Sequence, residues 1–226
     1  MKRIPFLSSW LHLGTYSFDK YIDFIENNFE STFSEIEEKF KELHAIPEDD
    51  PIREREEYHQ SYYDHLFDSA IDEHYEHDVF QQRYRYSVII QLFIFFETEM
   101  TRIINYHKEE VETNHRGTFL EKAKMVFKAK VNITTFAQHT FLMNFLELRN
   151  VLVHYNGKVK SSQPKIDKKI NCLKALKKVK GFTLKETENI KSIHYEVKIE
   201  EQEFLKYSLK QIEDFLNNLH KELKKD

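Results

Sequence analysis

The most constraining feature of the sequence is a nearly unbroken apolar run at residues 88–96, VIIQLFIFF, interrupted only by Gln91. A membrane-spanning helix needs about 20 apolar residues, so this run is too short to cross a bilayer. A helix that is apolar nearly all round is buried on most sides by its neighbours. We therefore predict a central buried helix over residues 80–113. The chain has only four glycines and four prolines, which favours long helices over a turn-rich β fold.

Apolar residues that recur in steps of three and four predict most of the other elements. These stripes indicate helices at 18–44, 136–154 and 201–224 and a basic amphipathic helix after Gly117. A further helix, rich in tyrosine, histidine and acidic residues, is predicted at 52–79, and a short helix is predicted at 165–176 within a lysine-rich stretch. Residues 1–16 are predicted to form an irregular arm. Two prolines and an acidic cluster indicate a loop at 45–51. The β-branched segment 131–135 is predicted to be a connector in which Thr135 caps the next helix.

Two segments near the C-terminus, residues 181–186 and 193–199, alternate between apolar and polar residues. This alternation, with a polar turn between the segments, predicts a two-stranded hairpin. The predicted fold class is mainly α, a helical bundle with a small β-hairpin before the last helix. The length favours a single domain over 1–226, with a core bundle at 18–154 and a C-terminal portion at 155–226.

The number of cysteines and the composition of the N-terminus give an expectation for the cellular location of the protein. The single cysteine, Cys172, excludes an intramolecular disulfide and a cysteine-rich zinc site. We therefore expect a reducing, cytoplasmic location. The apolar residues near the N-terminus are few and are broken by Ser8, Ser9 and His12, which is unlike a signal peptide.

Charge is distributed unevenly along the chain, although the net charge is only −4. Residues 18–78 contain 20 acidic and 5 basic side chains, whereas residues 157–185 contain ten lysines and one acid, Asp167. Such polarity can steer an anionic partner to the basic half. Solvent-exposed faces of a protein can also differ in charge by chance. The sequence therefore leaves two interpretations open: an anionic partner that binds the basic half, or a charge difference without function.

A candidate site lies at the end of the predicted helix 136–154. Arg149, Asn150 and His154 lie in its last turns, and Asn156 and Gly157 are suited to end it in a left-handed conformation. Histidine exchanges a proton near neutral pH, and arginine presents a planar, permanently charged fork to phosphate oxygens. These groups suit RNA cleavage by the RNA's own 2′-hydroxyl, with neither metal nor cofactor.

The geometry of a helix restricts how these groups can act together. Asn150 and His154 share a face, but Arg149 and His154 are about 140° apart on an ideal helix. They converge on one ligand only if the last turn is distorted. Two such sets facing each other across a two-fold axis would supply both an acid and a base.

The segment RNVLVHYNG resembles the Arg-x4–6-His signature of the HEPN superfamily, with Arg149, four residues and His154, and with Asn150 as the polar residue after the arginine. LFIFFETEMTRI at 92–103 is similar to that family's central helix, where Glu97 matches an acidic residue close to the arginine. The resemblance covers roughly residues 18–154.

The resemblance implies a HEPN-like domain and a metal-independent endoribonuclease in a toxin–antitoxin or phage-defence setting. It also implies a homodimer with a composite active site and an antitoxin or other regulatory partner. One subgroup is modified on a tyrosine two residues after the histidine. Here Asn156 occupies that position, and the tyrosine, Tyr155, directly follows His154. This departure argues against that subgroup's partner enzyme.

Other residues leave alternatives open. Lys158 and Lys160 either hold flanking phosphates or are simply solvated, and Tyr155 either stacks on a base or packs at a dimer seam. A non-catalytic helical module that binds RNA or protein would explain the charge asymmetry equally well. A metal-dependent hydrolase is a third reading, with His65, Asp68 and Asp72 at helical spacing.

Overall fold

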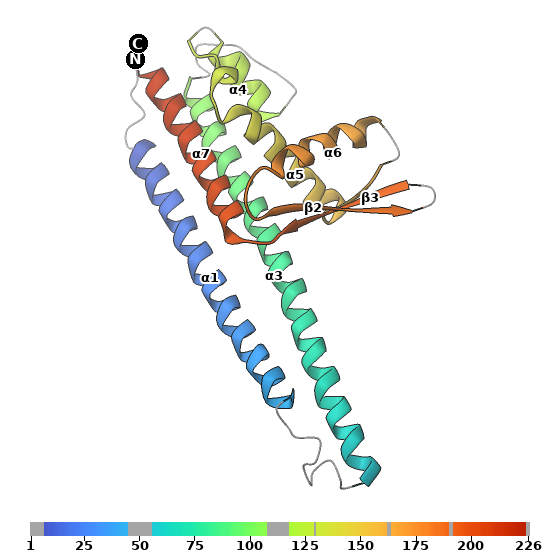
Figure 1. Cartoon of the computed structure of the whole chain (residues 1–226). Coiled ribbons are helices and arrows are strands. Elements are labelled where there is room, and N and C mark those ends of the chain that lie inside the picture. Colours follow the sequence, from blue (N-terminus) through green and yellow to red (C-terminus); the bar gives the residue numbers. More distant parts are fainter. Residues whose placement is uncertain are drawn as a thin grey trace. The chain divides into compact units, whose positions relative to one another are not determined.

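A computed structural model describes residues 7–44, 56–107, 118–128, 130–161, 164–189 and 192–224. Its elements, in chain order, are α1 (Leu7–His44), α3 (Glu56–His107), α4 (Phe119–Phe127), η2 (Ile133–Thr135), α5 (His139–Tyr155), β1 (Lys158–Lys160), α6 (Pro164–Leu176), β2 (Phe182–Asn189), β3 (Ser192–Ile199) and α7 (Gln202–Leu223). The predicted fold class is confirmed, because the chain is mainly helical with a small antiparallel sheet before the last helix (Figure 1).

The chain divides into two compact units. The first unit comprises Met1–Ile22 and Arg85–Asp226, and the second comprises Asp23–Tyr84. Among the described residues, no helix combines the length and apolarity needed to span a membrane.

Two predicted boundaries in the N-terminal half of the chain are wrong. Residues 7–16 belong to α1, where we expected an irregular arm. Leu11 and Thr15 are buried one turn apart, and the Thr15 hydroxyl donates to the Leu11 carbonyl, so the apolar stripe begins earlier than the sequence suggested. The predicted helices 52–79 and 80–113 are one helix, α3. No proline or glycine separates them, and our division rested only on a change in composition.

The connector before α5 also differs from the prediction. Residues 133–135 form the short 3₁₀ helix η2, and Thr135 donates its hydroxyl to the Asn132 carbonyl instead of capping α5. Asn132 is the capping residue, since its side-chain oxygen accepts from the Thr134 amide. Consequently α5 begins at His139. The loop predicted at 45–51 lies outside the described residues.

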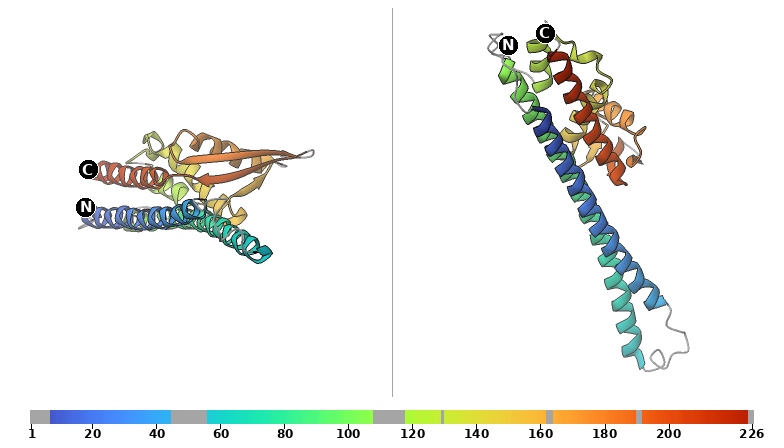
Figure 2. Two further views of the ribbon diagram at one scale, coloured as in Figure 1. Left: turned by 60° about the horizontal axis from the view of Figure 1, so that its bottom comes forward. Right: turned by 90° about the vertical axis from the view of Figure 1, so that its left-hand side faces the viewer.

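The core of the first unit is aromatic. Phe96 of the predicted buried run lies edge-to-face against Phe119 of α4, at 5.1 Å between ring centroids, and against Phe215 of α7, at 5.6 Å. Phe96, Phe145 and Phe215 are fully buried. Edge-to-face pairs add to the stabilisation that burial of the rings already gives. The end of α3, with α5 and α7, therefore forms the packed centre of this unit (Figure 2).

The sheet has the strand order β1–β3–β2 and is antiparallel throughout. β2 and β3 form the predicted hairpin, with Phe182 opposite Ile199 and Asn189 opposite Ser192. The third strand, β1, was not predicted, and it pairs Lys158–Lys160 with 194–196 of β3. One face of the sheet is buried, with Val159, Leu184, Tyr195, Val197 and Ile199 among its side chains.

Because β1 is so short, β3 extends past it and leaves carbonyl groups without a strand partner. Two side chains of α3 satisfy these groups. The Tyr86 hydroxyl donates to the Val197 carbonyl, and Arg85 Nη1 donates to the carbonyls of Ile199 and Glu200, both at 2.8 Å. Arg85 is only 5% exposed. Hydrogen bonds from a charged donor in such a position are strong, so α3 holds the open edge of the sheet.

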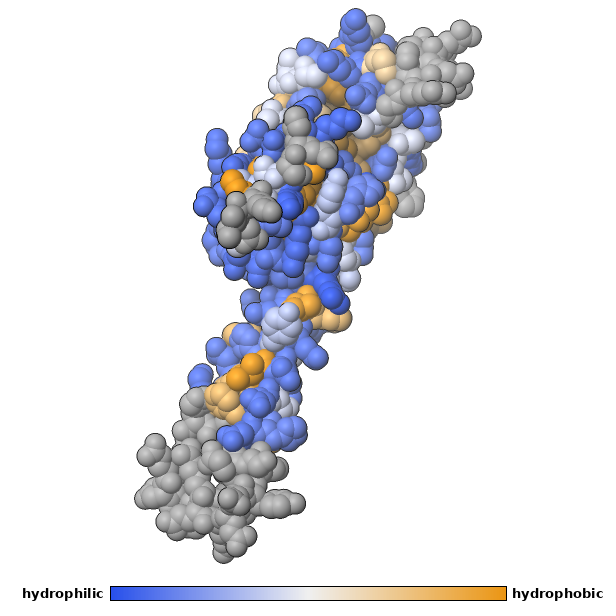
Figure 3. All heavy atoms as spheres, turned by 90° about the vertical axis from the view of Figure 1, so that its right-hand side faces the viewer, coloured by the Kyte–Doolittle hydropathy of each residue, from blue (hydrophilic) through white to orange (hydrophobic). Residues whose placement is uncertain are grey.

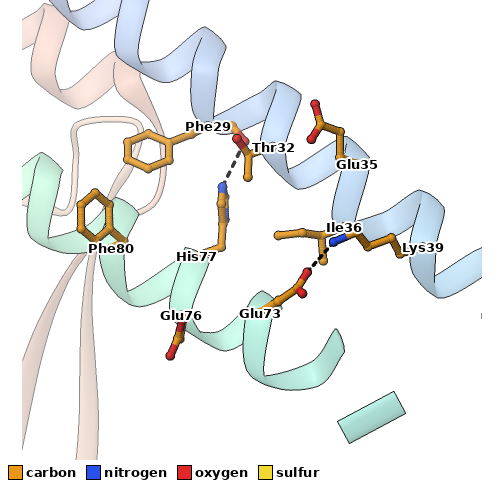
Figure 4. Close-up of a pocket in the computed structure, with 9 residues that line it drawn as sticks. All are labelled: Phe29, Thr32, Glu35, Ile36, Lys39, Glu73, Glu76, His77 and Phe80. Carbon is orange, nitrogen blue, oxygen red and sulfur yellow. Dashed lines mark hydrogen bonds and ion pairs between the residues drawn. The ribbon is translucent and has the colours of Figure 1, made fainter. Parts of the chain in front are cut away.

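In the second unit, α1 and α3 pack through aromatic side chains. His77 of α3 lies 3.0 Å, measured from Nε2, from the Phe29 carbonyl of α1, and Lys39 forms an ion pair with Glu73 at 2.9 Å. Figure 4 shows both contacts beside an open hollow of about 460 Å³. Because a carbonyl oxygen only accepts hydrogen bonds, Nε2 of His77 carries the hydrogen in this contact.

We predict that Tyr86→Phe lowers the free energy of unfolding by about 1–3 kcal/mol, because the part-buried Val197 carbonyl loses its donor. Burial, with a contribution from Glu196, raises the pKa of Tyr86 to about 12. The contribution of Tyr86 is therefore complete below the ordinary tyrosine pKa of about 10 and is lost as the pH rises toward 12. Urea unfolding from about pH 8 to pH 11 should show a steeper loss in wild type than in the variant.

Tyr207→Phe is the matched control, because Tyr207 is 41% exposed. Equal effects of the two substitutions on the free energy of unfolding would contradict the assigned role of Tyr86.

Candidate helix-end site

The end of α5 is sharply defined. Asn156 and Gly157 both adopt left-handed backbone conformations, with φ of 48° and 76°, which confirms the predicted termination. The amides of both residues donate to the Val151 carbonyl, at 3.2 Å for Gly157. A hydrogen atom in place of a side chain is needed at Gly157, because a Cβ there would lie 2.7 Å from the Tyr86 hydroxyl oxygen. Because the left-handed residues come only after Tyr155, α5 stays helical through Tyr155.

Arg149 is held in place on the side of α5 that faces α3. Its guanidinium carbon lies 5.3 Å from the centroid of the Phe93 ring, and its Nη1 donates to Asn150 Oδ1 at 3.2 Å. The Nε atom is buried and has no hydrogen-bond partner within the described part of the chain. Stacking on an aromatic face and an amide contact orient the guanidinium, while part of its hydrogen-bonding capacity is left for another group.

His154 lies on a different side of the helix and is exposed. In the described ranges it makes no hydrogen bond or ion pair. Because the last turn is regular, the angle between Arg149 and His154 stays near 140°, and the distortion needed to bring them together is absent. Asn150, by contrast, shares the face of His154 at i, i+4. A single chain therefore brings Arg149 and Asn150 together and leaves His154 apart.

The expected pairing of Glu97 with Arg149 is wrong within one chain. Glu97 is exposed, and Arg149 contacts Asn150 and Phe93 instead. The contacts between Tyr86 and Gly157 and between Phe93 and Arg149 show that α3 and α5 run antiparallel. Glu97 lies one turn beyond Phe93, which is farther from the His154 end of α5.

The three residues predicted to bind RNA lie at the end of α5 and directly after it, since Tyr155 is the last residue of the helix and Lys158 and Lys160 belong to β1. Lys158 and Lys160 are exposed on β1, and Lys158 lies 3.5 Å from a carboxylate oxygen of Glu196. Tyr155 is 40% exposed, and the Lys169 ammonium lies 5.6 Å from its ring centroid. The exposed part of Tyr155 and the two lysines are accessible to a ligand at this end of the site.

Sequence reasoning missed several residues that shape this region. Arg85 and Tyr86 position the sheet edge, and nothing in their local pattern distinguishes them from the other polar residues of α3. β1 carries a usable signal, since Val159 is the one apolar residue between Lys158 and Lys160. Three residues are too few for the periodicity test to detect.

Other chemical groups are less suited to catalysis. Burial is the main cause that raises the pKa of the half-buried Cys172 thiol, which makes it a poor nucleophile at neutral pH. His65, Asp68 and Asp72 are all exposed. Among the residues that the structure describes, no three histidine, cysteine or acidic side chains gather in a way that would hold a metal.

No family model, curated protein or solved structure matches the chain.

We predict that Gly157→Ala destabilises the protein by about 2 kcal/mol or more, since a left-handed alanine is strained and its Cβ displaces the Tyr86 hydroxyl. Asn156→Gly is the control at the adjacent position, where glycine adopts the same φ without steric cost. It should leave stability unchanged or slightly raised. Chemical denaturation measures both, and a neutral Gly157→Ala variant would contradict the close contact.

Proposed function

We propose that the protein is a metal-independent endoribonuclease whose active site is assembled from two copies of the chain. The observation that carries the proposal is the arrangement at the end of α5. Arg149 is oriented by Phe93 and Asn150, and its buried Nε is unpaired. The exposed His154 lies five residues later on another side of the helix and is followed by Lys158 and Lys160. A fixed cation, a titratable imidazole and flanking lysines are what cleavage of an RNA phosphodiester requires.

In the proposed reaction, one His154 removes the proton of the 2′-hydroxyl, and the 2′-oxygen attacks the adjacent phosphorus. The bond from phosphorus to the 5′-oxygen breaks, and His154 of the second copy protonates the leaving oxygen. The products are a 2′,3′-cyclic phosphate and a 5′-hydroxyl. Arg149 stabilises the negative charge that builds on the phosphoryl oxygens, and Asn150 orients Arg149.

A second copy is part of the proposal because Arg149 and His154 point about 140° apart on a regular helix. A two-fold axis would bring the Arg149, Asn150 and His154 groups of the two copies to one shared interface, and no third chain would be needed. Met143, which is 38% exposed, shares the helix face of Asn150 and His154 and offers an apolar contact at such an interface. The HEPN resemblance supports the same arrangement, together with an antitoxin or other regulatory partner in a toxin–antitoxin or phage-defence setting.

We expect the purified protein to cut single-stranded RNA in the presence of EDTA and to leave cyclic phosphate ends. Arg149→Ala and His154→Ala should each reduce cleavage at least about 100-fold, because each removes a group that acts in the transition state. Gel analysis with end-group mapping measures this. Arg83→Ala and His12→Ala remove the same residue types at exposed positions and should cut normally. Wild-type rates for either site variant, with an unchanged fold, would refute the assignment.

The composite site makes a separate prediction about mixing. If both copies supply His154, adding an equimolar amount of His154→Ala chain to wild type should lower cleavage to about half after subunits exchange. If each chain carried a complete site, the wild-type chains would keep their full activity after the same amount of variant chain was added. Measuring the initial cleavage rate against the fraction of variant distinguishes the two, and an unchanged rate despite verified exchange would contradict the two-copy site.

A second function, a non-catalytic module that binds RNA, is favoured by one observation. α5 stays regular through Tyr155, so nothing within one chain brings His154 to Arg149. Such a module would bind RNA in a salt-dependent way and show no turnover between about pH 6 and pH 8. The EDTA cleavage assay separates these two functions directly.

A further inference from the structure

The solvent-facing side of the sheet carries an unusual set of side chains. Residues on a strand alternate between its two faces, and one face is buried, so the register assigns the remaining side chains to the other. From β1 to β2, one row contains Lys160, His194 and Thr187, and the next contains Lys158, Glu196 and Lys185. A third row contains Lys198 and Thr183. Rows are about 7 Å apart and neighbouring strands about 4.8 Å apart.

This face is strongly basic. Its four lysines outnumber its single acid, Glu196, which is already the ion-pair partner of Lys158 at 3.5 Å. Lys185 and Lys198 have no acidic partner within the described ranges. Like charges this close repel one another unless an anion lies between them. The face is therefore arranged to gain stability from a bound polyanion.

A hollow of about 210 Å³ lies on the same face. Its lining includes Lys158, Lys160, Thr187, His194 and Glu196. The Thr187 hydroxyl and the Lys160 ammonium are hydrogen-bond donors, and His194 contacts the Ser192 hydroxyl at 3.1 Å through Nε2. Ammonium and hydroxyl donors at this density match phosphate oxygens. The side from which the β2–β3 hairpin points outward is largely hydrophilic (Figure 3).

The solvent-facing side of the sheet is continuous with the proposed active site. Lys158 is four residues after His154, and the Val197 amide donates to the Gly157 carbonyl at 2.8 Å, which joins the end of α5 to β3. A strand of nucleic acid whose scissile phosphate lies at His154 therefore reaches the first row of lysines within a few nucleotides. Tyr195 also lines the hollow, but its side chain belongs to the buried face of the sheet. Among the described residues, the solvent-facing side therefore has no tyrosine, phenylalanine or tryptophan ring on which bases would stack, and its chemistry suits the phosphate backbone.

We propose that the solvent-facing side of the β1–β3–β2 sheet is a phosphate-binding platform that holds the single-stranded RNA flanking the cleavage point, through Lys160, Lys185 and Lys198 with His194 and Thr187. The proposal rests on the proposed ribonuclease function for the identity of its ligand. It adds a binding surface that lies outside the helix-end site and reads RNA without regard to base sequence.

The test separates binding from cleavage by using RNA that cannot be cut. A fluorescein-labelled 2′-O-methyl RNA of about 20 nucleotides is titrated with full-length protein, and anisotropy is followed at several salt concentrations. The test variant is Lys160→Gln, Lys185→Gln and Lys198→Gln combined. The matched control is Lys122→Gln, Lys124→Gln and Lys221→Gln combined, since these lysines are exposed on α4 and α7.

We expect the test variant to bind at least about tenfold more weakly at physiological salt, and the slope of log affinity against log salt to fall by roughly two. The control variant should bind like wild type, and oligouridylate and oligoadenylate of equal length should bind alike. Equal affinity of the test variant and wild type, or no binding by wild type, would overturn the platform. Binding that depends on these lysines without cleavage of ordinary RNA would instead overturn the proposed ribonuclease and leave the platform standing.

Discussion

The open edge of β3 is the constraint on which the rest of the first unit depends. β1 pairs with only three residues of β3, so the carbonyls of Val197 and Ile199, and that of Glu200 directly after the strand, have no partner in β1. A buried carbonyl without a donor costs about as much as a lost hydrogen bond. Tyr86 and Arg85 supply those donors from consecutive positions of α3. The sheet is thus bound to the helix that also contributes to the aromatic core. These bonds fix the position of the sheet relative to that core.

The same contacts determine where the end of α5 lies. Gly157 lies against Tyr86, and Arg149 lies against Phe93, two turns along the same helix. Two contacts on an antiparallel neighbour leave α5 no freedom to slide or rotate. Phe93 also packs on Phe119 and Phe145 in the core, at 5.6 and 6.5 Å between centroids. The position of the Arg149 guanidinium is consequently set by the packing of the whole unit, although it lies at the surface of that core.

Much of the fold could be predicted because long apolar stripes and alternation are local signals. The hairpin, α4, α6, α7 and the left-handed end of α5 follow from such patterns. β1 and the bonds of Arg85 could not be predicted, since both depend on which segments meet in space. Glu97 illustrates the limit for the site. Phe93, Phe96 and Met100 occupy the buried side of α3, so a residue one position after Phe96 turns toward solvent. Proximity in sequence to a buried run does not give the side on which a residue lies.

Rigid termination of α5 has a consequence for how the proposed enzyme would be controlled. Because two amides converge on the Val151 carbonyl, His154 does not swing toward Arg149 without breaking those bonds. Local motion within one chain is then a costly route to an active site, whereas association of two chains needs no change in α5. Activity would accordingly follow the concentration of the assembled form, and anything that covers the face of Asn150 and His154 would suppress it. Such control would require no separate regulatory site, because in the proposed enzyme the surface that joins the two chains is also the surface that cleaves.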